Sequence, residues 1–175
     1  DVVETATFKN VRVIVPPKPD YVPYRDYIGS HIELMDVATG DRKIVFSADN
    51  SWQAPNWIVD NNVFTVNSDG LLYDFDLRTG KPTKLETGAA VRNNNDHVLS
   101  FDGKQMGISS TPPEDGHSII FTMPRKGGTP KRLTPNGPSY LHGWSPNAKE
   151  LVYTAVRDNA WNIFKIPASG GQEVQ

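Results

Sequence analysis

The sequence predicts an all-β protein, a β-propeller of four-stranded antiparallel blades with about three complete blades and one partial blade. Three observations predict this fold class. Two different strand motifs recur along the chain, and they recur in phase with each other. The spacing is about 40–45 residues, which suits one four-stranded blade. No stretch shows sustained helical periodicity, whereas short alternating runs separated by Gly-rich or Asp-Gly turns are common.

The first motif is an alternating strand, a glycine-containing turn and a second short strand. It occurs as "HIELMDVATGDRKIVF", "GLLYDFDLRTGKPTKL", "HSIIFTMPRKGGTPKRLT" and "WNIFKIPASGGQEVQ". The turn glycines Gly40, Gly80, Gly127 and Gly170 are 40, 47 and 43 residues apart. The longest step contains "STPPEDGH", which we interpret as a loop insertion.

The second motif brings Trp57, Leu99 and Trp144 into register, 42 and 45 residues apart. Each is followed by a polar turn and a short strand, namely "NVFTV", "QMGIS" or "ELVYTA". Together the motifs predict complete blades at residues 54–89, 94–134 and 140–175, while residues 31–47 supply only the last two strands of an earlier blade. A β-sandwich with accidental similarity between hairpins is the alternative, and the in-phase repetition favours the propeller.

The chain divides into an N-terminal strand ("FKNVRVIV") with a Pro/Tyr-rich connector at residues 1–30 and a partial propeller at residues 31–175. Its 175 residues carry a net charge of −2, which gives no basic footprint for nucleic acid. The absence of cysteine excludes disulfides and thiolate metal sites. No apolar run approaches the ~20 residues of a membrane span. Because the first residue is Asp, we expect a processed or trimmed N-terminus.

The sequence "GWSPNAKELVYTA" followed by "NIFKIPASGGQEV" resembles the TolB-like, PD-type (WD-like) propeller repeat. The resemblance covers roughly residues 31–175, and "NNDH", "GPSYLHGWSP" and "APNW" resemble an uncharacterised bacterial subgroup. The copies depart from the pattern: "WIVDNNV" lacks Ser-Pro, "LSFDGKQ" has Phe for Pro, and "WSPNAKE" has Asn-Ala for Asp-Gly. The resemblance implies a ring of about six blades, so we expect further blades from the same or a second chain.

The resemblance also implies a function. TolB-like propellers act as ligand- or protein-binding modules of the bacterial cell envelope, which implies a periplasmic or secreted protein, with a cytoplasmic one as the other option. The alternative is a carbohydrate-active enzyme similar to oligogalacturonate lyase, which would use channel histidines and a divalent metal. Whether the chain is an enzyme is left open, because the sequence contains no P-loop, Gly-x-Ser-x-Gly or His-Glu-x-x-His motif.

Candidate site residues cluster where blades begin. The first strand of a blade is expected to line the central channel, and "NNNDH" and "NGPSYLHGW" both occupy its start. His97 and His142 are 45 residues apart, so we expect both at one channel mouth together with Asn95 and Asp96. His97, His142 and Asp96 could bind Mn, Ca or Zn, because imidazole and carboxylate are ligands of such ions.

Other interpretations of the same residues stay open. A saccharide could hydrogen-bond to the polar cluster and stack on Tyr140, and Arg92 could face an anionic ligand. Alternatively, Asp96 and His97 brace adjacent blades through hydrogen bonds to the backbone. We expect Trp57 and Trp144 to pack between blades, because large aromatic side chains contribute strongly to cores.

Overall fold

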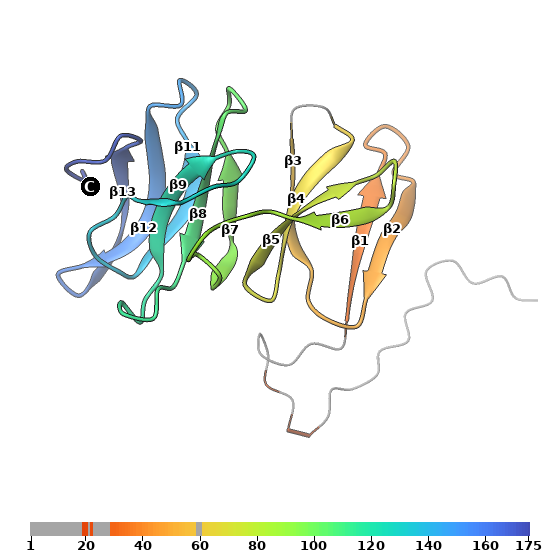
Figure 1. The fold of residues 1–175 in the computed structure, drawn as a ribbon, viewed down its shortest axis with the longest axis horizontal. Coiled ribbons are helices and arrows are strands. Elements are labelled where there is room, and N and C mark those ends of the chain that lie inside the picture. Colours follow the sequence, from red (N-terminus) through yellow and green to blue (C-terminus); the bar gives the residue numbers. More distant parts are fainter. Residues whose placement is uncertain (1–18, 21, 23–28, 59–60) are drawn as a thin grey trace, which may run out of the picture.

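The structure of the protein is a computed structural model that describes residues 19–20, 22, 29–58 and 61–175. Within this part of the chain all regular secondary structure is β (Figure 1). The same part contains no helix with the length and apolar character needed to cross a bilayer. The strand expected near residue 10 and most of the Pro/Tyr-rich connector lie outside the described residues, so the division at residue 30 stays a prediction.

Two complete four-stranded antiparallel blades confirm the expected units at residues 54–89 and 94–134. The strands of each follow one another outward in chain order. The first blade contains β3 (Gln53–Trp57), β4 (Val63–Ser68), β5 (Leu71–Asp76) and β6 (Lys81–Lys84). The second blade contains β7 (Asn93–Leu99), β8 (Gln105–Ser110), β9 (Ile119–Pro124) and β10 (Lys131–Arg132).

The third blade is a three-stranded sheet of β11 (Ser139–Trp144), β12 (Glu150–Arg157) and β13 (Ala160–Pro167). Its expected fourth strand is reduced to an isolated bridge between Lys165 and Val174. At the other end, β1 (Ser30–Met35) and β2 (Arg42–Ala48) form a hairpin, here called the N-terminal hairpin. This hairpin confirms the partial blade expected from residues 31–47.

The turns of the first motif have a local cause. Asp36 and Asp76 accept backbone N–H bonds from the residues two positions later, at 2.8 and 2.9 Å. The turns then close on Gly40 and Gly80, whose φ angles of 76° and 66° favour glycine. The repeated Asp-x-x-Thr-Gly pattern therefore specifies a tight hairpin at the same place in two blades.

The apolar core lies between successive sheets, as in a propeller. The first strands of the three blades, β3, β7 and β11, are neighbours. Leu141, Leu151 and Tyr153 of the third blade pack against Ile120 and Leu133 of the second. Leu72 and Leu85 of the first blade pack against Met106, Ile108 and Met123. Ile32 of the N-terminal hairpin joins Phe64, Val66 and Phe75.

The tryptophan prediction is right for one residue and wrong for the other. Trp144 is 7% exposed, and its indole N–H donates to the Val98 carbonyl of the second blade at 3.0 Å. Trp57 holds the same register position, yet its exposure is 48%. The blade before Trp144 offers four strands, whereas only β1 and β2 are described before Trp57. Among the described residues, Trp57 therefore lacks the inner strands that cover Trp144.

Candidate functional site

The start of β7 is bulged, and the asparagines of "NNNDH" explain why. Asn93 pairs with Ser110 and His97 with Ile108, so residues 94–96 lie opposite a single residue of β8. The Asn94 side chain accepts the backbone N–H of Asp96 at 2.9 Å, which stabilises the bulge. The Asn93 amide donates to the Gly70 and Ala90 carbonyls at 2.8 and 2.7 Å. Asn93 thus anchors the connection between the first two blades.

His97 lies between the first and second blades rather than in open solvent. Its exposure is 1%, and its Nε2–H donates to the Thr65 carbonyl of β4 at 3.3 Å. A carbonyl can only accept, so Nε2 carries the proton, and the buried Nδ1 has no partner among the described residues. Burial lowers the pKa of His97, although the Thr65 carbonyl opposes this effect. The neutral ring therefore bridges two blades.

The structure does not bring the imidazoles of His97 and His142 together. Strand β11 is also bulged, between Leu141 and Gly143. As a result Leu141 pairs with Tyr153 and occupies the register position that His97 holds in the second blade. The His142 ring is exposed, with Nε2 3.1 Å from the Thr154 hydroxyl of its own blade.

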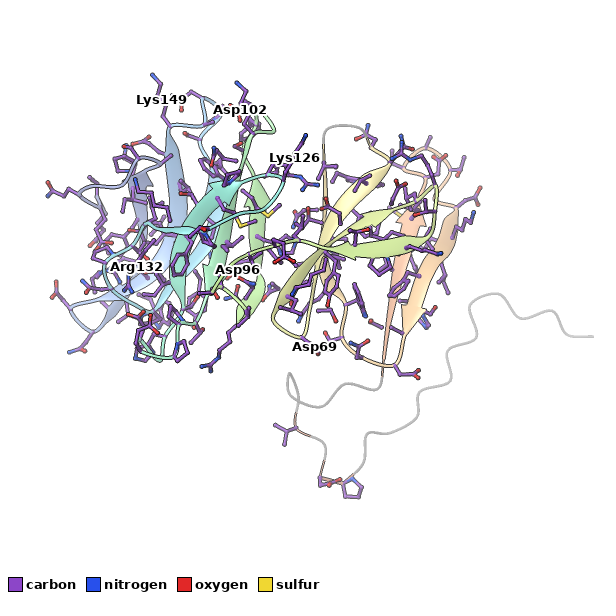
Figure 2. The ribbon with its side chains drawn as sticks, viewed as in Figure 1. Asp69, Asp96, Asp102, Lys126, Arg132 and Lys149 are labelled. Carbon is purple, nitrogen blue, oxygen red and sulfur yellow. The ribbon has the colours of Figure 1, made fainter. Side chains whose placement is uncertain are left out.

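Asp96 and His142 do approach each other. Burial raises the pKa of Asp96. The nearby His142 imidazole and the hydrogen bond to Asn94 act in the opposite direction and lower the pKa of Asp96. Asn95, beside them, is exposed. We call Asn95, Asp96 and His142 the channel-mouth cluster, after the position predicted for them from the sequence. The strands that carry them, β7 and β11, are in contact. Figure 2 places Asp96 and Asp69 toward one end of the sheets, and Asp102 and Lys149 toward the other.

The remaining candidates lie beside this cluster. The Tyr140 ring is half-buried and packs on Trp161 of the same blade, with the ring centroids 6.0 Å apart. The Arg92 side chain is exposed, and its backbone carbonyl accepts the Thr111 N–H at 3.0 Å. Tyr140 lies two residues before His142 in β11, and Arg92 lies one residue before β7, so a common ligand for them stays a prediction.

The cluster offers few metal donors. Within the described ranges, no group of three or more His, Asp and Glu side chains is arranged to hold a metal ion. Asp96 and His142 supply one oxygen and one nitrogen donor, whereas His97 faces the neighbouring blade. A Mn, Ca or Zn site at these residues stays a prediction that needs further ligands.

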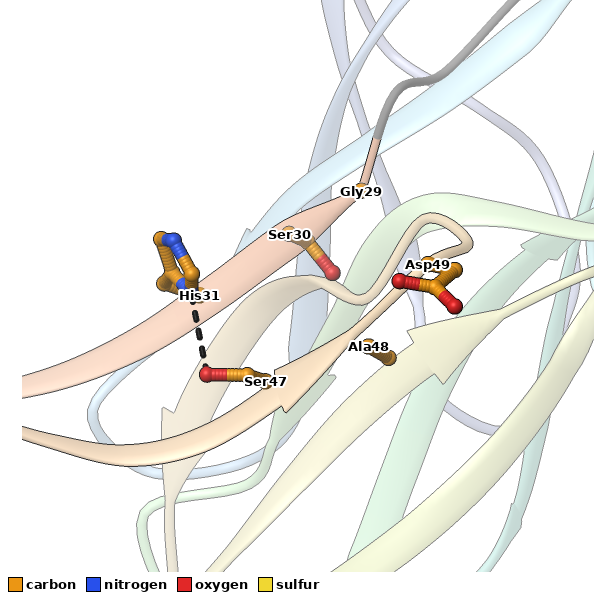
Figure 3. Close-up of a pocket in the computed structure, with 6 residues that line it drawn as sticks. All are labelled: Gly29, Ser30, His31, Ser47, Ala48 and Asp49. Carbon is orange, nitrogen blue, oxygen red and sulfur yellow. Dashed lines mark hydrogen bonds between the residues drawn. The ribbon is translucent and has the colours of Figure 1, made fainter. Parts of the chain in front are cut away.

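A polar cavity of about 500 Å³ lies at the start of the N-terminal hairpin (Figure 3). It contains a Ser-His-Asp set, in which His31 Nδ1 lies 3.0 Å from the Ser47 hydroxyl. A hydrolytic triad needs a carboxylate on the other imidazole nitrogen. Figure 3 shows Asp49 away from the His31 ring, so these residues do not form one. His31, in β1, and His117, in the connection before β9, are both exposed.

Comparisons with known proteins agree with the fold. No family model matches the chain. An uncharacterised protein of Agrobacterium fabrum is 39% identical over 147 residues, which are 83% of this chain and 50% of the relative. A solved structure from Agrobacterium tumefaciens, assigned as a TolB, shares 37% identity at a TM-score of 0.77 and matches 85% of this chain and 53% of that one.

TolB from Acinetobacter baumannii is more distant in sequence, at 21% identity, but matches 82% of this chain and 36% of that one at a TM-score of 0.68. At that identity the likeness shows the fold alone. The chain spans about half the length of the curated relative it matches. The chain has a TolB-like β-propeller fold and corresponds to about half of the solved structure that it matches.

Proposed function

We propose that the chain belongs to a TolB-like propeller that binds another protein in the bacterial cell envelope. The observation that carries the proposal is the 37% identity to a protein assigned as a TolB, extending over 85% of this chain. Likeness of fold alone would not name a function. The compartment that fits this role is the periplasm.

The channel-mouth cluster is the binding surface that we propose. It presents the exposed Asn95 amide, the half-buried Asp96 carboxylate and the exposed His142 imidazole at one end of the inner strands. Such groups can donate to and accept from the backbone of a partner. The bulges in β7 and β11 place them outside the regular ladders, and bulges often re-aim side chains in this way.

The lyase-like alternative requires a histidine that reaches substrate or metal. His97 is 1% exposed and bonded to the first blade, so it would have to leave that interface. No observation on the described residues favours sugar or metal binding over protein binding. Titration calorimetry with Mn, Zn and Ca, and with acidic oligosaccharides, tests the alternative directly.

The test of the proposal is site-specific photo-crosslinking in intact bacterial cells that express the full-length protein. A photo-reactive side chain replaces Asn95, and a matched chain carries it at Asp102, which is exposed at the other end of the sheets. We expect a discrete protein adduct from position 95 that disappears in the Asp96→Ala, His142→Ala double variant. Identical adducts from both positions, or none from position 95, would refute the proposal.

A further inference from the structure

The second blade carries a loop that the repeat itself does not need. In the first and third blades the second and third strands are joined by two residues, 69–70 and 158–159. In the second blade the same connection takes eight residues, 111–118. This connection coincides, but for one residue at each end, with the stretch "STPPEDGH" that we interpret as a loop insertion, and it forms one wall of a cavity of about 150 Å³.

The walls of this cavity are mainly apolar, although Ser110, Glu114 and Thr129 also line it. Pro112 and Pro113 come from the loop, Phe121 from β9, and Ala89 and Ala90 from the connection between the first two blades. An engineered apolar cavity of about the same volume holds one benzene ring. The space therefore suits one medium-sized side chain and not an extended small molecule.

The loop that forms the cavity is held in place. Both guanidinium N–H₂ groups of Arg132 donate to the Asp115 carboxylate at 2.7 and 2.8 Å. Such bidentate pairs fix geometry. Next to Thr129 and Pro130, which also line the cavity, Gly128 donates its N–H to the Glu86 carbonyl at 2.7 Å. A cavity whose walls are already fixed loses less entropy when it is filled.

One lining residue of this cavity is ionisable, namely Glu114. Its side chain is exposed, and it takes part in no ion pair within the described part of the chain. An apolar space next to one unpaired carboxylate is complementary to an aliphatic stem that ends in a cation. Lys side chains bury their methylene stems along apolar surface in this way while the ammonium group stays in water.

We propose that this cavity, bounded by Ala89, Pro112, Phe121 and Glu114, receives a lysine side chain of the protein partner. The inference rests on the proposed protein-binding function, and it names one anchor of that partner. The lysine stem packs between the prolines and Phe121, and its ammonium group pairs with the Glu114 carboxylate. Interfaces concentrate their binding energy in a few such filled pockets.

The test uses small probes whose binding does not depend on knowing the partner. Nα-acetyl-lysine methylamide is titrated into the protein, with Nα-acetyl-norleucine methylamide as the uncharged control of the same stem length. The methyl NMR signals of Ala89 and Ala90 report on the cavity. We expect saturable shifts with the lysine probe, with a dissociation constant of about 1 mM or weaker, as for other ligands of this size.

Two variants make the test specific. Glu114→Gln is expected to weaken the lysine probe about two- to fivefold, the effect of one exposed ion pair, and to leave the norleucine probe unchanged. Ala89→Leu fills the space and should abolish binding of both probes, while the melting temperature shows that the fold persists. Glu33→Gln, on the N-terminal hairpin, is the matched control and should bind like wild type.

The outcomes separate this inference from the proposed function. Two results would overturn the lysine pocket even if position 95 still yields its protein adduct. One is a set of shifts that do not saturate, and the other is a Glu114→Gln variant that prefers the lysine probe over the norleucine probe as strongly as the wild type does. Conversely, saturable and Glu114-dependent binding without any adduct from position 95 would support the pocket and refute the channel-mouth proposal.

Discussion

Substitution of Gly107 in β8 measures how closely the second and third blades pack. A methyl group built on Gly107 would lie 2.6 Å from Cδ2 of Leu141 and 3.0 Å from Cδ2 of Leu151. Both distances are shorter than carbon atoms tolerate, and both leucines are at most 1% exposed. The Gly107→Ala substitution must therefore push two buried side chains that have little room to move.

Two opposing effects set the magnitude. Overpacking a close-packed core costs about 1–3 kcal/mol. Alanine in a strand recovers about 0.5–1 kcal/mol, because glycine loses more backbone entropy on folding. The expected net loss in the free energy of unfolding is therefore about 0–2.5 kcal/mol. With a urea m-value of about 2 kcal/mol/M, the midpoint falls by up to about 1.2 M.

The matched control is Gly143→Ala in β11. A methyl group on Gly143 would meet nothing within 4 Å, so only the backbone effect remains. We expect Gly143→Ala to be neutral or up to about 1 kcal/mol more stable in urea unfolding followed by circular dichroism. If Gly107→Ala matches Gly143→Ala within about 0.3 kcal/mol, the close contact between the two blades does not exist as described.

Three further predictions concern single side chains. Burial lowers the pKa of His97 in the folded state, so the free energy of unfolding should fall as the pH drops below about 6.5, the pKa in the unfolded chain. His97→Gln should flatten that part of the curve when urea midpoints are plotted against pH. Glu173→Gln removes the negative charge and one of the two carboxylate oxygens that accept from Tyr153 (2.6 Å) and Arg157, so it should cost about 1–3 kcal/mol. It should also reduce the raised pKa of Tyr153 in an ultraviolet titration, where an unchanged tyrosine would refute the contact. Trp144→Ala should cost about 3–5 kcal/mol by thermal or urea unfolding. Trp57→Ala should cost clearly less, since half of that ring is exposed, and equal losses would contradict the difference in burial.

The pairing of strands within each blade was predictable because it follows from the repeat. Trp57, Leu99 and Trp144 were aligned from their spacing alone. In the structure each pairs with the second residue of the next strand, namely Phe64, Met106 and Leu151. Alternation fixes which face each side chain occupies, so one correct register carries through the blade.

The histidine alignment failed to predict geometry because of one extra residue. His97 and His142 match in the sequence repeat, but the bulge in β11 moves Leu141 into the register position of His97. A single inserted residue leaves no signal in hydrophobic spacing, yet it changes which side chain faces the neighbouring blade. The Asp96–His142 approach and the burial of His97 therefore needed the three-dimensional structure.

The insertion at residues 111–118 was visible in the sequence as a longer repeat step. What it builds was not, because the cavity combines Pro112 with Ala89 and Phe121 from three separate segments. The His31–Ser47 contact lies within the N-terminal hairpin, where the two residues are directly opposed on β1 and β2, so it depends on the register of that pair of strands. Spacing along the chain locates loops, but contacts between loops depend on how neighbouring sheets are placed.

The interface between the first and second blades and the interface between the second and third blades have different chemistry, although the sheets are alike. Between the first and second blades, Asn56 donates to the His97 carbonyl at 2.9 Å, and Arg125 pairs with Asp74 at 2.8 Å. Between the second and third blades, Gly107 allows close apolar packing against Leu141. The backbone repeat needs only a strand at each position, so it leaves these facing side chains free to differ.

The exposed face of the third blade also carries its own side chains at positions equivalent to those in the other blades. Val152 stands where Gly107 stands in the second blade and Thr65 in the first, and it is 37% exposed. Ile163 and Trp161, on the neighbouring strand β13, are 66% and 61% exposed. A valine side chain cannot enter a contact as close as the one that Gly107 makes. A further blade packed on this face would therefore sit farther from β12 than the third blade sits from β8, and would contact a mainly aliphatic and aromatic surface.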